Sequence, residues 1–171
     1  MIKSDKKLKE LAASLEKGDR DTITSAILSL RDEQPYEGVI SLLTQYYNKC
    51  KDIQIRRIIE QFMNDLKDQS ACEEVAGEIR KKWDDDTMSM LISSCWQSGL
   101  NYSEYSLDIA RAYMQCDYVT AIECLTVIET SINDLNSDNK KEIIRLLQSG
   151  NFKAAAEKRE LTLELISILN R

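Results

Sequence analysis

The sequence predicts an all-α protein, and three observations support this prediction. Apolar residues recur at spacings of three and four almost everywhere, as they do along one face of a helix. No segment sustains the strict alternation of apolar and polar residues that marks a half-buried strand. One proline and five glycines in 171 residues are far fewer than turn-rich sandwiches, barrels or glycine-rich nucleotide loops use.

The clearest predicted helix covers residues 52–67, where an apolar stripe that includes Ile55, Ile59 and Phe62 lies opposite a polar side. The same period predicts nine more helices, each with its own apolar positions: 5–17 (Leu8, Leu11, Leu15), 19–31 (Ile23, Ile27, Leu30), 36–49 (Val39, Leu42, Leu43, Tyr46), 70–83 (Val75, Ile79, Trp83), 86–98 (Met88, Leu91, Ile92, Cys95, Trp96), 103–115 (Leu107, Ala110, Tyr113, Met114), 117–130 (Val119, Ile122, Leu125, Ile128), 137–149 (Ile143, Ile144, Leu147) and 151–170 (Ala155, Ile166, Leu169). Together these helices account for almost the whole chain.

Short polar turns recur about every 33 residues, and longer connectors lie between them. The turns are Gly18-Asp19, Lys51-Asp52, Asp84-Asp85-Asp86, Cys116-Asp117 and Gly150-Asn151. A helix-stop glycine followed by an N-cap residue marks the first and the last of them. Pro35 opens a helix, where proline is tolerated. The spacing predicts about five antiparallel helical hairpins in a single domain, 1–171, which stack as an α-solenoid because no hairpin can bury its apolar face alone.

Several segments resemble the HEAT-like (armadillo-type) helical-repeat family. The hairpin at 36–66 has an apolar first helix, an Asp-Ile-x-Ile-Arg-Arg turn at 52–57 and an Ile-x-x-Phe-Met-x-x-Leu ending. Residues 107–129 are similar, residues 18–30 are a weaker match, and the runs 91–103 and 118–129 resemble small bacterial HEAT-like proteins. The resemblance implies a scaffold that binds other proteins along a concave wall. The Asp52/Arg56 pair has no basic counterpart in Asp117/Ala121 or Asp19/Ile23, which leaves the repeat count and the packing register open.

The composition excludes several kinds of site. The chain has no histidine, so histidine-dependent triads and histidine-ligated zinc are absent. Its five cysteines contain no CxxC pair and are expected to be reduced and mostly buried. No run of eighteen apolar residues and no apolar leader segment occurs, so we expect a cytoplasmic protein without a membrane span.

The charge is uneven along the chain. Residues 1–83 carry fifteen bases and fifteen acids, residues 84–138 carry ten acids and one base, and residues 139–171 carry seven bases and four acids. The middle segment therefore has a net charge of −9, which repels a phosphate backbone and attracts a basic protein or peptide. Nucleic acid is accordingly a less favoured partner.

Acidic side chains are the main candidates for a catalytic or metal site. Asp84, Asp85 and Asp86 stand at a predicted helix start, where acids interact favourably with the helix dipole. The pairs Glu74/Glu78 and Glu104/Asp108 share a helix face, and we interpret both as solvated surface. No catalytic residue, metal or cofactor is predicted, and we expect a non-enzymatic protein.

The candidate partner-binding residues lie on the polar stripe of the second helix of each hairpin, which lines the concave wall in the arrays that the chain resembles. With two tyrosines at a loop-to-helix start, they are Arg57, Gln61, Ser93, Gln97, Tyr102, Tyr105, Glu123 and Thr130. Trp96 and Tyr113 are expected to fill the core, and Tyr118 belongs to the same aromatic group.

Three alternatives stay open at this point. HEAT-like repeats also build DNA-alkylation-repair glycosylases, which use aromatic residues and a carboxylate, and Trp83 and Trp96 have acids nearby. They also build lyases that handle bilin chromophores. The third alternative is a structural unit that associates with itself. The oligomeric state does not follow from the sequence.

Overall fold

The computed structural model describes residues 2–32, 36–150 and 156–170, which form ten α-helices and no strand. This confirms the all-α prediction. The helices are α1 (Ile2–Lys17), α2 (Arg20–Ser29), α3 (Val39–Lys49), α4 (Ile53–Asn64), α5 (Ala71–Ile79), α6 (Asp85–Gln97), α7 (Ser106–Gln115), α8 (Tyr118–Thr130), α9 (Ser137–Ser149) and α10 (Ala156–Leu169), with short 3₁₀ helices at Leu30–Asp32 and Ser103–Tyr105. None of the helices in these ranges combines the length and the apolar character needed to cross a bilayer.

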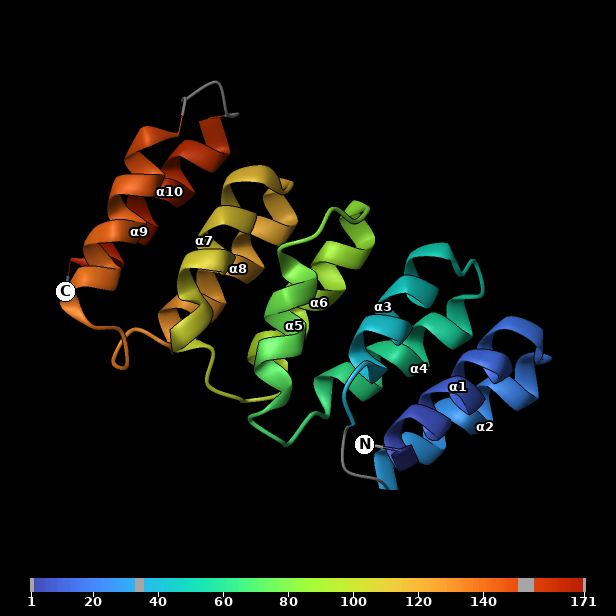
Figure 1. The fold of residues 1–171 in the computed structure, drawn as a ribbon. Helices are drawn as coiled ribbons and strands as arrows, with labels where there is room; N and C mark the ends of the chain where they lie inside the picture. Colours follow the sequence, from blue (N-terminus) through green and yellow to red (C-terminus); the bar gives the residue numbers. More distant parts are fainter. Residues whose placement is uncertain (1, 33–35, 151–155, 171) are drawn as a thin grey trace.

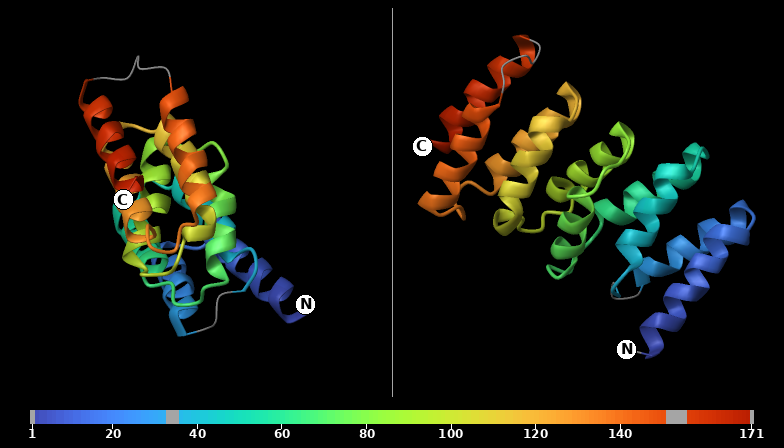
Figure 2. Two further views of the ribbon diagram at one scale, coloured as in Figure 1. Left: turned by 90° about the vertical axis from the view of Figure 1, so that its left-hand side faces the viewer. Right: turned by 45° about the horizontal axis from the view of Figure 1, so that its top comes forward.

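The helices form two layers in a row that runs from one chain end to the other (Figure 1). Each odd-numbered helix packs against the even-numbered helix that follows it. Each helix also packs against the next helix of its own layer, so α2, α4, α6, α8 and α10 form the even layer. The end-on view in Figure 2 shows α9 and α10 side by side at the end of the row.

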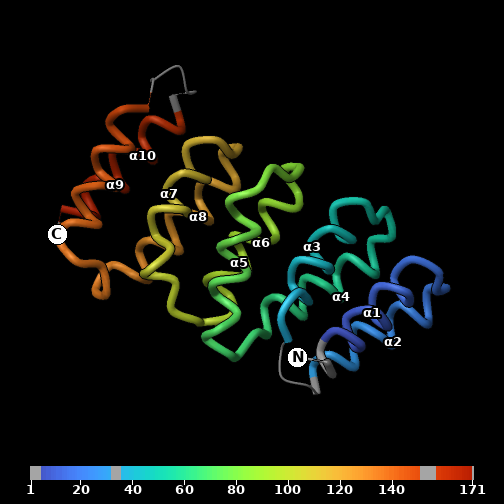
Figure 3. Tube along the Cα trace, in the orientation of Figure 1, coloured from blue at the N-terminus to red at the C-terminus, as the bar shows by residue number. Residues whose placement is uncertain are grey.

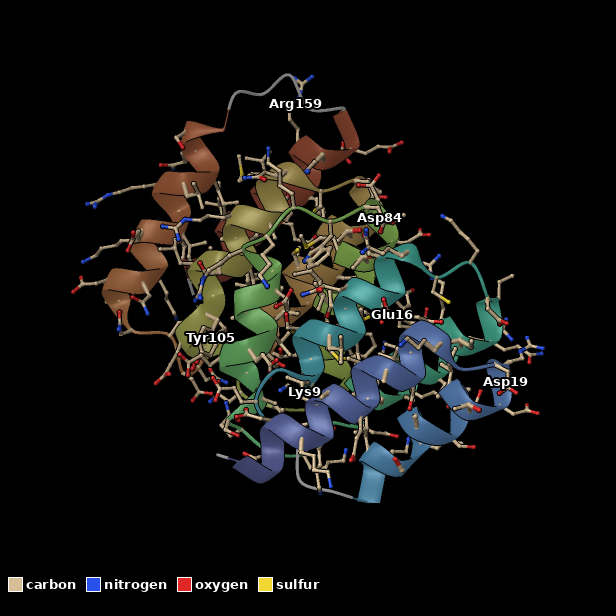
Figure 4. All side chains as sticks on the ribbon, turned by 45° about the vertical axis from the view of Figure 1, so that its right-hand side comes forward. Lys9, Glu16, Asp19, Asp84, Tyr105 and Arg159 are labelled. Atoms are coloured by element: carbon tan, nitrogen blue, oxygen red, sulfur yellow. The ribbon has the colours of Figure 1, made fainter. Side chains whose placement is uncertain are left out.

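The tight turns and the long connectors lie along opposite edges of the row (Figure 3). At the turn edge, an aspartate precedes each of α2, α4, α6 and α8, and its side chain accepts a backbone N–H of the first turn. The pairs are Asp19 with Thr22 (2.9 Å), Asp52 with Ile55 (3.3 Å), Asp84 with Thr87 (2.8 Å) and Asp117 with Thr120 (2.8 Å). Figure 4 labels two of these caps, Asp19 and Asp84. The interpretation of Asp84 as a cap is thus confirmed. Pro35, predicted to open a helix, and Asn151, predicted to cap one, lie outside the described residues.

Within the described residues, five predicted helix boundaries are wrong by three or four residues, and two of them are the start of α1, at Ile2 and not at 5, and the end of α4, at Asn64 and not at 67. α3 begins at Val39 and not at 36, because Gly38 has a φ of 91°, outside the helical region. α5 ends at Ile79 and not at 83, and the Trp83 indole folds back to donate a hydrogen bond to the Glu78 carbonyl oxygen at 2.9 Å. Residues 103–105 form a 3₁₀ turn before α7.

Apolar side chains from both layers form one continuous core. Tyr113 is buried within it, as predicted. Trp96, however, is 41% exposed, and so its predicted place in the core is wrong. Val119 and Ile122 are also exposed, at 63% and 41%, because α8 packs through other apolar positions. Of the five free cysteines, Cys72, Cys95 and Cys124 are buried, and Cys50 and Cys116 are partly exposed.

Most side chains of the pairs Glu74/Glu78 and Glu104/Asp108 are not exposed to solvent, contrary to the prediction. Glu78 is only 2% exposed, with one oxygen 2.5 Å from Lys81 Nζ and the other, Oε2, without a partner. Glu74 is half-buried and accepts a hydrogen bond from the Ser41 backbone N–H at 3.0 Å. The Asp108 side chain is 13% exposed, because two arginines cover it. Only Glu104 is a solvated residue, as expected.

Ion pairs join successive helix pairs at the turn edge. Arg20 contacts Asp52 at 3.0 Å, Arg56 contacts Asp86 at 3.1 Å, and Arg80 contacts Asp108 at 2.8 Å. The partners are separated by 32, 30 and 28 residues, close to the period of the turns. These contacts hold neighbouring helix pairs in one register.

Candidate functional site

The exposed apolar side chains gather on one layer of the molecule. Every large apolar side chain that is exposed in the described residues belongs to an even-numbered helix. They are Leu28 on α2, Ile53 on α4, Trp96 on α6, Tyr118, Val119 and Ile122 on α8, and Leu163 on α10. We call the outer surface of this layer the even face. Single exposed apolar residues are ordinary, and their restriction to one layer makes this layer the candidate interaction surface.

At its centre, on α6 and α8, the even face carries negative charge and no positive charge. Neither α6 nor α8 contains a lysine or an arginine. Both helices carry acids, which are Asp85, Asp86, Glu123 and Glu129. Four of the exposed apolar side chains, Trp96, Tyr118, Val119 and Ile122, come from the same two helices. The centre of the even face thus combines apolar contacts with negative charge.

Six of the eight predicted site residues lie on helices of the even layer. Arg57 and Gln61 are exposed on α4, Ser93 is half-buried and Gln97 exposed on α6, and Glu123 is half-buried and Thr130 exposed on α8. Three of them, Arg57, Ser93 and Gln97, line one groove of about 410 Å³ between α4 and α6. Gln61 and the two residues of α8 lie outside this groove.

The groove between α4 and α6 is lined by hydrogen-bonding side chains. Gln97 Nε2 donates to Ser93 Oγ at 2.7 Å, and its Oε1 accepts from Asn64 Nδ2 at 3.0 Å. Arg57 lines the same groove without an ion pair to a described residue within 4.0 Å. The groove therefore offers amide, hydroxyl and guanidinium groups that can donate hydrogen bonds, and the amides and hydroxyl can also accept them.

A fixed cation forms the deeper wall of the groove. Arg56 lies over the Tyr47 ring, 4.2 Å from its centre, and bonds Asp86 at 3.1 Å. Tyr47 donates its hydroxyl hydrogen to Glu60 at 2.6 Å, and burial and this carboxylate raise the pKa of Tyr47. Burial disfavours the charged guanidinium, but Tyr47 and Asp86 outweigh burial and raise the pKa of Arg56. The wall is therefore held rigidly by ring stacking and charge-assisted hydrogen bonds.

Trp96 connects α6 to α8. Its indole Nε1 donates to the Glu123 carboxylate, which places the ring across the boundary between the two helices. Glu123 was predicted as a site residue and Trp96 as core, and the structure brings the two together at the surface. The indole is thereby presented beside the exposed side chains of α8.

Tyr102 and Tyr105, which were predicted as partner-binding residues at an exposed loop-to-helix start, do not lie on the even face, and Tyr102 is not exposed. Tyr102 is 1% exposed, and burial raises the pKa of its hydroxyl, which makes no hydrogen bond of good geometry and lies beside the Cys72 and Cys95 thiols. Tyr105 is half-buried and packs edge-on against Tyr102, with ring centres 6.4 Å apart. Both lie at the connector edge, and Figure 4 shows Tyr105 far from Asp84 at the turn edge.

Sequence reasoning missed Ile53, Tyr118, Val119 and Ile122. The sequence of α8 does indicate that Tyr118, Val119 and Ile122 are unusual. This helix has apolar residues on more than one side and contains no lysine or arginine. A helix that is apolar all round is either completely buried or covered by a partner. The position of α8 in the even layer leaves part of that surface open.

Within the described residues, no group of three acidic or cysteine side chains is placed to hold a metal ion. No known protein family, no curated protein and no solved structure matches this chain. The function is therefore inferred from the even face and the groove.

Proposed function

We propose that the protein is a non-enzymatic adaptor, built as a short HEAT-like α-solenoid of five helical hairpins, that binds a protein partner on its even face. The pairwise packing of the helices supports this architecture. So do the aspartate caps at 19, 52, 84 and 117, which recur at intervals of 32 to 33 residues. Repeats of this kind present extended surfaces to partners.

In this proposal the even face is the concave side of the solenoid. From α2 to α8, successive even-numbered helices approach one another more extensively than the odd-numbered helices from α1 to α7 do, and only at the C-terminal end is the order reversed. In a curved double layer, the layer with the closer spacing lies on the inside. A partner on this side can contact several hairpins at once.

The confinement of exposed apolar side chains to the even layer is the observation that carries the proposal. Trp96, Val119 and Ile122 provide apolar contact area at the centre, and aromatic side chains are frequent anchors in interfaces. Because α6 and α8 carry acids and no base, the fitting partner has apolar side chains flanked by lysine or arginine. Complementary charge also accelerates its association.

A photo-crosslinking amino acid at Val119 tests the proposal in cells of the natural source. Val119 is 63% exposed, so the replacement leaves the core intact. The matched control carries the same amino acid at Glu142, which is exposed on α9 of the odd layer. We expect one partner protein to be crosslinked at position 119 and not at 142, through a segment that is apolar and basic. Adding Glu123→Lys should weaken this adduct.

Other outcomes would contradict the adaptor proposal. Identical adducts at positions 119 and 142, or none at 119, would show that the even face binds no specific protein. An adduct with a second copy of the chain would indicate self-association, which gel filtration would confirm. A shift of duplex DNA at low salt that Glu123→Lys strengthens would favour a DNA-binding protein.

A further inference from the structure

A cavity of about 590 Å³ lies between the α5–α6 turn, α7 and the start of α8. It lies outside the groove between α4 and α6, with which it shares no lining residue. Apolar and charged side chains line it together. The apolar ones include Ile79, Trp83, Met88 and Ala112, and the charged ones are Arg80, Lys81, Lys82, Asp85, Asp108 and Arg111.

Positive charge is concentrated at this cavity. Between positions 69 and 139 the chain has four basic residues and thirteen acidic ones. All four bases line the cavity, but only two of the acids do. The lining thus carries four positive and two negative charges in the most acidic part of the chain. Solubility would not require that every base of this stretch converge on one cavity.

Internal ion pairs leave part of this positive charge uncompensated. Arg80 donates through Nε and Nη2 to Asp108 Oδ2, at 3.0 and 2.8 Å, and Arg111 donates to Oδ1 at 3.2 Å. One carboxylate therefore serves two guanidinium groups. Lys81 pairs with Glu78, whereas no ion pair within 4.0 Å joins Lys82 to another described residue.

The apolar wall is fixed next to these cations. The Trp83 indole is anchored by its hydrogen bond to the Glu78 carbonyl oxygen, and the residue stays partly exposed in the cavity lining. Met88 is partly exposed in the same lining and comes from α6. A ligand with a flat apolar body finds contact area here, and polar groups at the rim orient it.

We propose that this cavity binds a small organic anion, with its acidic group between Lys82 and Arg111 and its apolar body against Trp83 and Met88. The acidic group is a carboxylate, sulfonate or phosphate, because Arg111 offers guanidinium donors beyond the one held by Asp108. The cavity shares Asp85 with the acids assigned to the even face, but it contains none of the exposed apolar side chains of that face, and its occupancy does not rest on the adaptor function.

Two related fluorescent probes test the site. 8-Anilinonaphthalene-1-sulfonate is an apolar anion, and N-phenyl-1-naphthylamine has the same ring body without the sulfonate. Trp96→Phe leaves Trp83 as the only tryptophan of the chain. Energy transfer from Trp83 to the probe then shows that the probe is bound next to the cavity wall. We expect both probes to bind, the anionic one more tightly, and added salt to weaken only the anionic one.

Removing the charges of Lys82 and Arg111 at the cavity rim separates the affinity for the anionic probe from the affinity for the neutral one. Lys82→Gln with Arg111→Gln should weaken the anionic probe about tenfold, as expected for the loss of two partly exposed charge contacts, and should leave the neutral probe unchanged. The matched control is Lys140→Gln with Lys141→Gln on α9, which removes the same charge outside the cavity. Lys82→Gln alone, which breaks no ion pair of the described residues, keeps the test decisive if the double variant is unstable.

Three results would overturn the proposal. The first is an equal loss of the anionic probe in the rim and control variants. The second is an equal loss of both probes in the rim variants. The third is the absence of energy transfer from Trp83. Crosslinking at Val119 uses a different surface, so it reports on the adaptor proposal separately.

Discussion

Glu74 caps a helix other than its own. Its carboxylate accepts the Ser41 N–H in the first turn of α3, whose N-cap, Gly38, has no capping side chain. Burial raises the pKa of Glu74, and the charges of Glu78 and Glu37 add to the effect, while the backbone hydrogen bonds oppose it. The folded protein therefore binds a proton at Glu74 more readily than the unfolded chain does, and it loses this stability as the pH rises through the folded-state pKa.

Glu74→Gln should consequently stabilise the protein at neutral pH. The amide oxygen keeps the hydrogen bond to Ser41 while the buried charge is removed. We expect a higher Tm than wild type at pH 7 and a difference that shrinks toward about pH 4, where the unfolded carboxyl is itself protonated. Glu73→Gln, at an exposed neighbouring position, is the control. A variant that is less stable than wild type at pH 7 would contradict the prediction.

Tyr113 on α7 and Tyr102 in the α6–α7 connector are both buried but differ in the surroundings of their hydroxyl groups. The Tyr113 hydroxyl lies 2.8 Å from Thr162 Oγ1, whereas the Tyr102 hydroxyl makes no hydrogen bond of good geometry and has only the weakly bonding thiols of Cys72 and Cys95 beside it. Tyr113→Phe should cost about 1 kcal/mol of unfolding free energy, and Tyr102→Phe should be neutral or stabilising. Urea denaturation of both variants measures the difference. Equal losses would show that the Tyr102 hydroxyl has a partner in solution.

The cap of α8 connects a single carboxylate to the stability of a helix. Asp117 accepts the Thr120 N–H at 2.8 Å, and hydrogen bonds to the side chain and backbone of Thr120 lower the pKa of Asp117. Asp117→Ala should cost about 1 kcal/mol near neutral pH. Because the part of this stability that comes from the lowered pKa is present only while the group is ionised, the cost should shrink as the pH falls below about 4.

Asp117→Asn is the control for the cap, since asparagine also caps helices well. It should lose much less stability than the alanine variant. Thermal unfolding between pH 2 and pH 7 separates the three proteins. A pH-independent cost of Asp117→Ala would show that Asp117 contributes through packing and not through its charge.

The helices could be predicted from the sequence because their signals are local. An aspartate that caps a helix, such as Asp52 or Asp84, is close in the chain to the amide that it accepts from. The burial of α8 could not be predicted, because its apolar residues occupy more than one side. Whether Val119 or Leu125 is buried depends on which neighbouring helices pack against α8, and this information lies elsewhere in the chain.

The candidate site was predicted in part for the same reason. Gln97 and Asn64, which are 33 residues apart, meet because equivalent positions of successive helix pairs are neighbours. Tyr102 was misplaced, because the connector that carries it folds inward until its hydroxyl lies near Cys72 and Cys95. A loop sequence rich in polar residues gives no sign of such burial.

The whole molecule should be least stable at its N-terminal end. α1 and α2, like α9 and α10, have a neighbouring helix pair on one side only, whereas the helices from α5 to α8 are covered on both sides, and α1 packs less extensively on α3 than α9 does on α7. In a linear array, a pair with one interface opens at a lower free energy than a pair with two. Native-state hydrogen exchange should thus be fastest in α1 and α2 and slowest in α6 and α8. Uniform protection along the chain would indicate one cooperative unit.

Each helix pair packs mainly against its immediate neighbours in the row. An additional helix pair would therefore add buried and exposed surface in a constant ratio. A globular domain behaves differently, since the fraction of its surface that is buried rises with chain length. In this molecule, chain length therefore sets the reach of the even face, while the thickness of the core stays that of two helices.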